Sequence, residues 1–215
     1  MKKLWVLTVL ISTICYSQNI YYFDSKTDYE FTNHLDTTKN CIKTYYTNSK
    51  DNSYSIYRIM LDSTTSNIEF IDSNGVYVKK KVSNSIFNNK NIYIARNEIR
   101  NYTYLFLYQL NNYHFSEVND TIISNKAYKH ITFLSNDLKR AKRKKLGTLQ
   151  YIFDTDLDHQ PLLTFSTAFE VWRVTRKMPN GLVVQSHLRD IQNKLVFSEK
   201  LRQINSITLY LIIPE

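Results

Sequence analysis

The stretch from Asn180 to Pro214 alternates between apolar and polar side chains, and this pattern constrains the fold more than any other feature of the chain. Residues 182–189 form a first run with the two-residue period of a strand that buries one face. A second run covers 195–202, and a third begins at Ile207, after Asn205 interrupts the pattern. Three such runs joined by short polar turns predict a β-meander.

The composition favours strands in the rest of the chain as well. Seventeen Tyr, eleven Phe and many Ile, Val and Thr residues suit a pleated, half-buried surface. Only three Gly are present, whereas Asn is abundant. Because Asn tolerates the left-handed conformation that turns require, we expect it to replace Gly in many of them.

Short strand-like runs follow one another along the chain. Asn74-Gly75 predicts a type I′ hairpin turn, and Ser124-Asn125 separates two further strands. A short helix or irregular crossover is expected near 97–109, a loop at 154–167, and a strand or a turn of helix at 168–175. The remaining predicted strands are 21–23, 29–35, 41–47, 54–60, 68–72, 76–82, 92–95, 121–123, 126–134 and 148–153.

These runs predict one all-β domain with minor helix. About ten strands in one unit are expected to form a single antiparallel sheet that curls into a half-open barrel, because a flat sheet of that size leaves its apolar face exposed. A transmembrane β-barrel requires lipid-facing strands of about ten residues, and several runs here have only five to seven. No linker rich in Pro, Gly or Ser divides the chain, so we expect the domain to cover 18–215.

Residues 1–17 have the features of a Sec signal peptide. Lys2 and Lys3 precede an apolar segment of 11 residues, and Cys15 and Ser17 supply the small side chains that signal peptidase requires. Cys15 is a weaker candidate for lipidation, because Ile14 and Ser12 occupy the positions where a lipobox has a small residue and Leu. The sequence therefore predicts an exported protein that is periplasmic, associated with the cell envelope, or secreted.

Removing the predicted signal leaves 198 of the 215 residues and lowers the formal charge by two, from +9 to +7. Cys41 is then the single cysteine, so no intramolecular disulfide is expected. An exported domain of this kind depends on its hydrophobic core, and about 200 residues suffice to build one.

Six basic residues fall within the seven positions that follow Asp137 and Leu138, in the loop expected before the strand at 148. They are candidates for contact with an anionic surface, with lipid headgroups favoured over nucleic acid because no aromatic residues interleave the run. The alternative is a solvated loop. The residues are Lys139, Arg140, Lys142, Arg143, Lys144 and Lys145.

The motifs of most enzymes and metal proteins are absent. Acidic residues alternate at 154, 156 and 158 as in a Ca²⁺ loop, but His159 and Phe165 occupy the positions that need Gly and Glu. The five histidines stand singly, and no second cysteine accompanies them as a zinc ligand. No GxSxG or Gly-rich phosphate loop occurs. We therefore predict no catalytic residue, no metal and no cofactor, while a hydrolase without a recognisable motif stays open.

The aromatic residues of the predicted strands have two interpretations. They form ordinary core, or they line a pocket for an acyl chain on the concave side of the curled sheet. The residues in question are Tyr45, Tyr46, Tyr54, Tyr57, Phe70, Tyr77, Tyr128, Phe133, Tyr151, Phe153 and Phe197.

The hairpin at 120–133 and the predicted signal resemble those of exported proteins of Gram-negative envelopes. Ile123, Tyr128 and Ile131 resemble the core of the GLPGLI family, although the Gly of that core is missing, and 178–182 resembles its naming motif. Other members of this group are similar to the lipoprotein-carrier half-barrel. The resemblance implies an incomplete β-barrel that holds a lipid-like ligand.

The resulting functional prediction is a non-enzymatic exported protein that binds a hydrophobic ligand, either a lipid or a lipoprotein. The first alternative is an envelope protein-interaction or scaffold module, which would use the basic run and an exposed strand edge. The second is a hydrolase.

Overall fold

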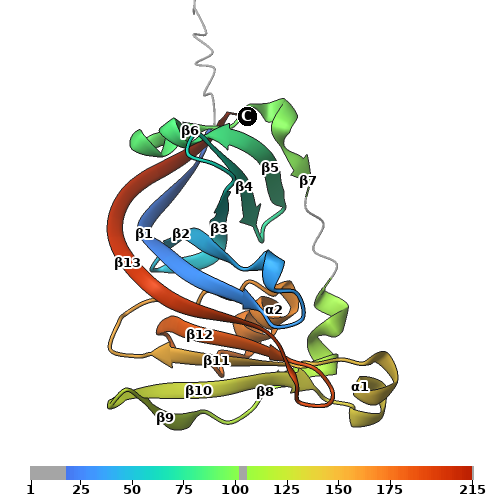
Figure 1. Ribbon diagram of the computed structural model, residues 1–215. Coiled ribbons are helices and arrows are strands. Elements are labelled where there is room, and N and C mark those ends of the chain that lie inside the picture. The colour runs from blue at the N-terminus through green and yellow to red at the C-terminus, as the bar shows by residue number, and fades with distance from the viewer. Residues whose placement is uncertain (1–17, 102–105, 215) are drawn as a thin grey trace, which may run out of the picture.

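Alternating side chains place most of the chain in strands, and the computed structural model describes residues 18–101 and 106–214 (Figure 1). The predicted signal peptide lies outside these ranges. Thirteen strands of the described residues form one sheet with the order β7-β5-β4-β3-β2-β1-β13-β12-β11-β10-β8, in which β6 also pairs with β13 and β9 with β10. Neighbours are antiparallel, except that β6 runs parallel to β13.

The strands have the following bounds: β1 Gln18–Asn33, β2 Cys41–Asn48, β3 Asp51–Met60, β4 Thr65–Asp72, β5 Val76–Ser83, β6 Asn91–Tyr93, β7 Arg100–Asn101, β8 Tyr113–Phe115, β9 Asn119–Ile123, β10 Lys126–Ser135, β11 Thr148–Asp154, β12 Leu182–Arg189 and β13 Leu195–Pro214. Two α-helices, α1 Leu138–Lys144 and α2 Ser166–Thr175, join them, with four short 3₁₀ helices, η1 Thr37–Lys39, η2 Asn84–Asn88, η3 Arg96–Glu98 and η4 Leu107–Asn112. Neither α-helix of the described ranges has the length and hydrophobicity needed to cross a membrane.

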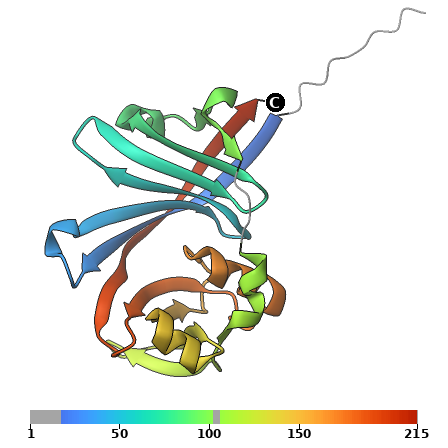
Figure 2. The same ribbon diagram turned by 90° about the vertical axis from the view of Figure 1, so that its right-hand side faces the viewer.

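The two longest strands connect two lobes. β1 and β13 pair over almost their whole length, from Gln18 opposite Pro214 to Asn33 opposite Phe197. Strands β2 to β5 continue the sheet from β1 and form the upper lobe, with β6 and β7, while β12, β11, β10 and β8 continue it from β13 and form the lower lobe. Figure 2 shows the two lobes with the paired strands running between them.

Each lobe has its own hydrophobic core. The upper core consists of residues such as Phe23, Ile56, Phe70 and Leu211, all of which are fully buried. In the lower lobe, α2 packs against the sheet and fills the interior. Its Trp172 is buried, and the indole Nε1 donates a hydrogen bond to the carbonyl oxygen of Met178 (2.9 Å).

The fold class predicted from the sequence is confirmed: the chain is mostly β, in one antiparallel sheet that curls without closing into a barrel. The three-run meander at the C-terminus is wrong, because the second and third runs are one strand, β13. Asn205 pairs with Lys26 at the level where β13 passes between the lobes, and 202–208 are mostly exposed there. The polar interruption therefore marks a gap between two cores rather than a turn.

The loop at Asn74-Gly75 differs from expectation, whereas Ser124 and Asn125 separate two strands as predicted. Asp72 pairs with Val76, so the loop between β4 and β5 has three residues and not the two of a type I′ turn. Gly75 supplies the positive φ of 121° that such a loop requires. The type I′ geometry occurs instead at Ser124 and Asn125, whose φ values are 51° and 65°.

Helices occur where the sequence predicted loops or left a choice. The basic run forms α1, because Lys and Arg favour helix and the Asp137 carboxylate accepts a hydrogen bond from the backbone N–H of Arg140 (2.9 Å). The segment at 168–175 belongs to α2, in which apolar side chains at helical spacing face the lower core. The crossover at 97–109 is irregular, with η3 and β7 before the undescribed residues and η4 after them.

Candidate ligand-binding groove

An apolar hollow on β2 to β4 lies between the lobes and has a volume of about 360 Å³. The opposite face of these strands covers the upper core, so the sheet uses alternate residues for the core and for the groove. We call this hollow the inter-lobe groove. Its lining residues come from β1 to β4, from β13 and from the end of the loop before α2: Phe31, Lys43, Tyr45, Ser55, Tyr57, Glu69, Ile71, Thr164, Phe165, Phe197 and Glu199.

A stacked pair of tyrosines forms part of its floor. Tyr45 of β2 and Tyr57 of β3 face each other directly across the two strands, with ring centroids 5.2 Å apart and an angle of 29° between the rings. Tyr45 also contacts the ring of Tyr29 edge-on, at 5.7 Å. Aromatic pairs at these separations add stability beyond the area that they bury. The floor is therefore largely apolar.

An ion pair stands in the middle of these rings. The Lys43 ammonium lies 2.6 Å from the Glu199 carboxylate, and both side chains are mostly buried, with 18% and 9% of their surface exposed. Lys43 Nζ also lies 3.7 Å from the ring centroid of Phe31. The carboxylate partner and the aromatic face together offset the free-energy cost of removing the ammonium group from water.

The Glu199 charge affects the tyrosines around it. Burial raises the pKa of Tyr45 well above its ordinary value, and the negative charge of Glu199 raises it further. Burial followed by the Glu199 charge also raises the pKa of Tyr29 and of Tyr151. Burial also raises the pKa of Tyr57, so both tyrosines that line the groove, Tyr45 and Tyr57, remain neutral at physiological pH.

Phenylalanines connect the groove with the lower lobe. Phe165 stacks on Phe197 with ring centroids 6.0 Å apart and nearly parallel rings, and Phe197 contacts Phe31 at 5.6 Å. Phe165 is 38% exposed, which is high for so large an apolar side chain. A second apolar cavity of about 410 Å³ lies in the lower lobe and shares Thr164 and Phe165 with the groove. The two hollows therefore adjoin at these residues.

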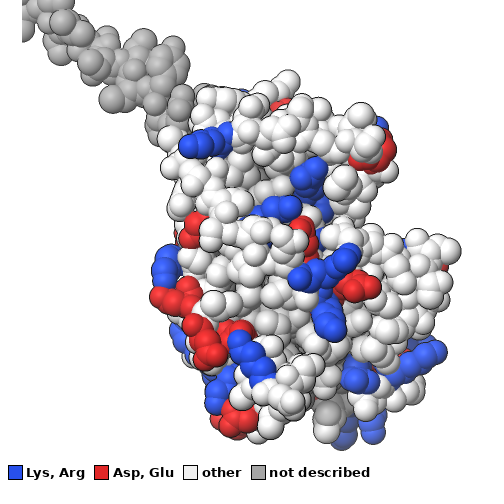
Figure 3. Space-filling model, turned by 60° about the vertical axis from the view of Figure 1, so that its left-hand side comes forward, with Lys and Arg blue, Asp and Glu red and all other residues white. Residues whose placement is uncertain are grey.

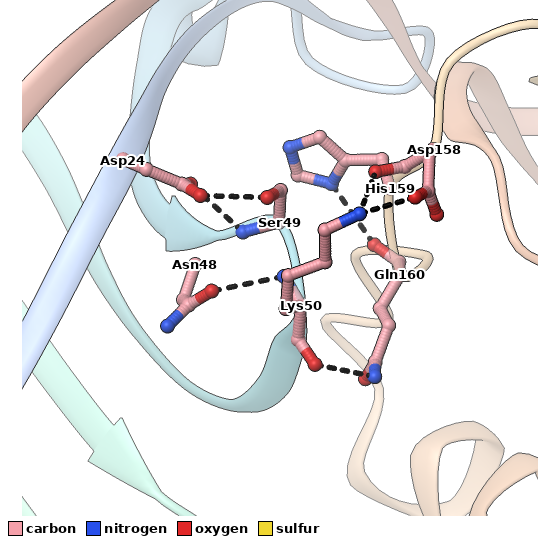
Figure 4. A network of polar contacts seen from close by, with 7 residues as sticks. All are labelled: Asp24, Asn48, Ser49, Lys50, Asp158, His159 and Gln160. Atoms are coloured by element: carbon pink, nitrogen blue, oxygen red, sulfur yellow. Dashed lines mark hydrogen bonds and ion pairs between the residues drawn. The ribbon is translucent and has the colours of Figure 1, made fainter.

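The loop 155–165, which carries Phe165 at its end, is fastened to the turn between β2 and β3 (Figure 4). The backbone N–H of Gln160 donates to the carbonyl oxygen of Ser49 (2.7 Å), and its Nε2 donates to that of Lys50 (2.5 Å). Lys50 also pairs with Asp158. On the other side of the turn, the Asp24 carboxylate accepts hydrogen bonds from the backbone and side chain of Ser49. These contacts hold one wall of the groove against the upper lobe.

The basic residues predicted to contact an anionic surface do not approach the groove. They all lie on α1 or its C-terminal cap, and five of the six are exposed. Arg140 is the exception: its Nη2 donates to Gln109 (3.1 Å), and its guanidinium lies over the ring of Tyr113. Among the described residues, none of the six forms an ion pair.

The acidic run and the histidines form no metal-binding arrangement within the described ranges. Asp154 pairs with Lys126, and Asp158 with Lys50, so two of the three carboxylates are directed to different lysines. His159 is buried and its Nδ1 lies 3.1 Å from the carbonyl oxygen of Gln160. The aspartates therefore stabilise turns and loop contacts.

The aromatic residues singled out from the sequence divide between core and groove. Tyr45, Tyr57 and Phe197 line the groove, whereas Tyr46, Phe70, Phe133, Tyr151 and Phe153 are buried in the cores. Sequence reasoning missed Lys43 and Glu199. A signal was available, because each occupies a position whose neighbours at i ± 2 include large apolar side chains, such as Tyr45 and Phe197.

No protein-family model and no curated protein matches the chain, and the resemblance to the GLPGLI family stays a prediction. Among solved structures, the chain is similar to MucB in complex with MucA(peri), with a TM-score of 0.43 and 8% identity over 87% of this chain and 51% of that one. It is also similar to MucB alone, with a TM-score of 0.41 and 9% identity over 86% of this chain and 53% of that one. For the Pseudomonas aeruginosa MucA/MucB complex, the TM-score is 0.38 and the identity 11%, over 85% of this chain and 51% of that one. The chain spans about half the length of the MucB chains that it resembles.

Proposed function

We propose that this protein is a non-enzymatic, exported binder of a hydrophobic ligand, the acyl chain of a lipid or lipoprotein, and that the inter-lobe groove holds it. The observation that carries the proposal is a hollow of about 360 Å³ with an aromatic floor, a size within the usual range for ligand pockets. Its carboxylates already have lysine partners, Glu199 with Lys43 and Glu69 with Lys79. An uncharged chain therefore suits the groove better than a charged one.

The position of the groove differs from the concave pocket expected from the sequence. The interior of each lobe is occupied by its own core, which leaves the space between the lobes for a ligand. An acyl chain longer than the groove has room to continue past Phe165 into the lower-lobe cavity. Phe165 lines both hollows, so its ring lies where they adjoin.

Blocking the groove tests the proposal. Ser55 lines the groove, and Ser55→Trp would fill it with an indole, whereas Ser63→Trp adds the same group at an exposed turn between β3 and β4. We expect N-phenyl-1-naphthylamine, a neutral apolar dye, to become fluorescent with the unaltered protein and with Ser63→Trp but not with Ser55→Trp. Organic extracts of the protein purified from a bacterial envelope should contain lipid by mass spectrometry.

Equal dye binding by both tryptophan variants would contradict the proposal, provided that Ser55→Trp retains the circular dichroism spectrum of the unaltered protein. The absence of lipid from the extracts, together with no dye binding, would also reject it. A fold defect in Ser55→Trp is recognised from the spectrum, and Ile71→Trp then serves as a second variant that fills the same hollow.

We further propose that α1 brings the protein to an anionic membrane surface. Five exposed cations without ion-pair partners in the described chain support this proposal, because each contributes about 1 kcal/mol near such a surface. Figure 3 shows basic and acidic side chains interspersed on the face that it presents.

Vesicle sedimentation tests the role of α1. We expect the protein to sediment with vesicles that contain phosphatidylglycerol but not with phosphatidylcholine alone. Replacing Lys142, Arg143, Lys144 and Lys145 with Glu should abolish this binding, and high salt should weaken it. Sedimentation that is unchanged by these substitutions would exclude α1 as the contact.

A further inference from the structure

A third hollow, on the other face of the upper lobe's sheet, has a polar and basic lining. Its volume is about 400 Å³, and it lies between β1 to β3, the segment 87–90 and residues 207–209 of β13. Lys26, Arg58 and Lys90 line it, with no Asp or Glu among the lining residues. We call it the Arg58 hollow.

The Arg58 guanidinium has no carboxylate partner in the described chain. Its Nε donates to Ser66 Oγ (2.9 Å), its Nη1 to the Tyr46 hydroxyl (3.1 Å) and its Nη2 to Asn84 Oδ1 (3.0 Å). All three acceptors are uncharged. A guanidinium has five N–H donors, so two remain after these bonds. The guanidinium is only partly exposed and lies 4.1 Å from the ring centroid of Phe87.

This arrangement fixes the guanidinium in place but leaves its charge uncompensated. Partial burial of a charge is costly unless an opposite charge lies close to it. The sequence places Arg58 on the same strand face as Ile56, which belongs to the upper core, so the side chain is directed toward the covered side of β3. A bound anion would supply the missing compensation.

The two lysines strengthen the positive field of the hollow. Lys90 forms no ion pair among the described residues, and its carbonyl oxygen accepts a hydrogen bond from the backbone of Tyr210, which holds the segment 87–90 against β13. Lys26 lies 3.4 Å from Asp28, the one carboxylate that pairs with a cation of the hollow. Three cations and one neighbouring anion leave two positive charges in excess.

We propose that the Arg58 hollow binds an anionic group of the phosphate class. A tetrahedral oxyanion with two negative charges matches the two charges in excess, and a planar guanidinium with free donors binds such oxygens in a defined orientation. Lys26 and Lys90 also line the hollow and would contact the remaining oxygens. The phosphate comes either as the free ion or as the headgroup of a lipid, and these sources share this chemistry.

Titrations followed by two-dimensional ¹H–¹⁵N NMR test the proposal. We expect inorganic phosphate, but not chloride at matched ionic strength, to shift the amide signals of 87–90 and 208. Lys90→Gln should weaken phosphate binding about tenfold, since it removes one charge-assisted contact. Lys144→Gln, on the exposed face of α1, removes the same charge elsewhere and should leave the affinity unchanged.

A second titration with dihexanoyl phosphatidic acid, a soluble lipid, distinguishes the two sources of phosphate. Binding tighter than that of inorganic phosphate, with shifts that extend to Ile207 and Leu209, indicates a lipid headgroup. Equal affinities indicate the free ion. Both outcomes support the anion site.

Equal loss of affinity in Lys90→Gln and Lys144→Gln, or no shift of the 87–90 signals with either ligand, would overturn the proposal. Arg58 also holds β3 to β4 and to Asn84, so Arg58→Gln risks a folding defect. Lys26→Gln carries no such risk and is expected to weaken phosphate binding as Lys90→Gln does. The anion site and the inter-lobe groove use different residues, so either can fail without the other.

Discussion

Lys43 and Glu199 are held by the pairing of their strands. Glu199 lies opposite Phe31 on one side and Ser186 on the other, while Lys43 lies opposite Tyr29. A buried ion pair adds little net stability compared with apolar residues of the same shape, but removing one member leaves the other charge without a partner. The pair is therefore more sensitive to single than to double substitution.

We expect Lys43→Met to lower the free energy of unfolding by about 3 kcal/mol, because Glu199 then remains buried without its cation. The double variant Lys43→Met with Glu199→Leu should recover most of this loss. Urea unfolding at neutral pH measures both effects.

Lys79→Met is the matched control for this prediction. Lys79 pairs with Glu69 at 3.8 Å but is well exposed, so its loss should change stability by less than about 1 kcal/mol. A double variant as unstable as Lys43→Met would show that the packing around the pair, and not the unpaired charge, determines its contribution.

His187 gives the protein a pH-dependent stability. Burial, followed by the nearby charges of Arg189, His130 and His34, lowers the pKa of His187 below its ordinary 6.5. The folded protein thus binds the proton less tightly than the unfolded chain does. Protonation of His187 therefore does not reduce the free energy of unfolding above about pH 7. The free energy of unfolding falls as the pH drops through 6.5 toward the lower pKa of His187 in the folded protein.

The test measures the urea midpoint of unfolding from about pH 7.5 to about pH 5.5, and we expect the midpoint to decline over this range. His187→Gln should make the decline shallower, since Gln does not titrate, and the remaining decline comes from His130, whose pKa burial also lowers. The acids with lowered pKa values, such as Asp36 and Glu98, lose their stabilising charge only at more acidic pH and do not affect this window. An equally steep decline in His187→Gln would refute the role of this histidine.

At the scale of elements, the sequence predicts strands well wherever one face meets a core. The hairpins of β4 with β5 and of β9 with β10 were expected from their alternation and their turn residues. Turn geometry was less predictable. Both Asn-Gly and Ser-Asn permit positive φ, and the register of the flanking strands determines which loop has two residues and which has three.

β13 and α1 show where local patterns are insufficient. The polar residues near Asn205 suggest a strand end, but pairing with β1 continues through them. The basic run has no apolar period, so its helix depends on the Asp137 cap and on intrinsic propensity. The partner that continues β13 lies on β1, far away in the sequence, whereas the Asp137 cap of α1 is adjacent to the basic run.

The loop 155–165 is an element whose attachment can be tested directly. Gln160 bonds to Ser49, Lys50 and Asn52, and two of these three bonds use its side chain. Gln160→Ala should therefore increase hydrogen–deuterium exchange in 155–165 about tenfold, the effect of losing about 1.4 kcal/mol of local stability. The midpoint of global unfolding should change little, because Leu163 is the one residue that the loop contributes to either core.

Asp158→Asn serves as the control for the loop. Asp158 and Lys50 are both mostly exposed, so their ion pair should add little, and exchange in 155–165 should stay close to that of the unaltered protein. If Asp158→Asn released the loop as strongly as Gln160→Ala, the ion pair rather than the hydrogen bonds of Gln160 would fasten it.

At the scale of the molecule, the inter-lobe groove could not be located from sequence. Its lining residues come from segments near 31, 57, 165 and 199, and their meeting depends on how the sheet turns between β1 and β13. Alternation identifies which side chains face inward but not which of two interiors they face. The single curled sheet was therefore predictable, whereas its division into two lobes with a groove between them was not.

The two cores raise the question of whether the lobes unfold together. β1 and β13 each run through both lobes and pair with each other along almost their whole length. Unfolding of one lobe would therefore disrupt the two strands on which the other lobe is built. We therefore expect one cooperative transition, in which a defect in the upper core destabilises the lower one equally. Trp172, the one tryptophan of the described chain, reports on the lower core by fluorescence.

Ile56→Ala in the upper core should lower the free energy of unfolding by about 2–5 kcal/mol, since Ile56 is fully buried. The urea midpoint of Trp172 fluorescence and that of circular dichroism should shift by the same amount. Ile204→Ala, at an exposed position of β13, should shift neither by more than about 0.5 kcal/mol. If the fluorescence midpoint stayed fixed while circular dichroism split into two transitions, the lobes would be independent units, because β1 and β13 would then fail to couple the two cores.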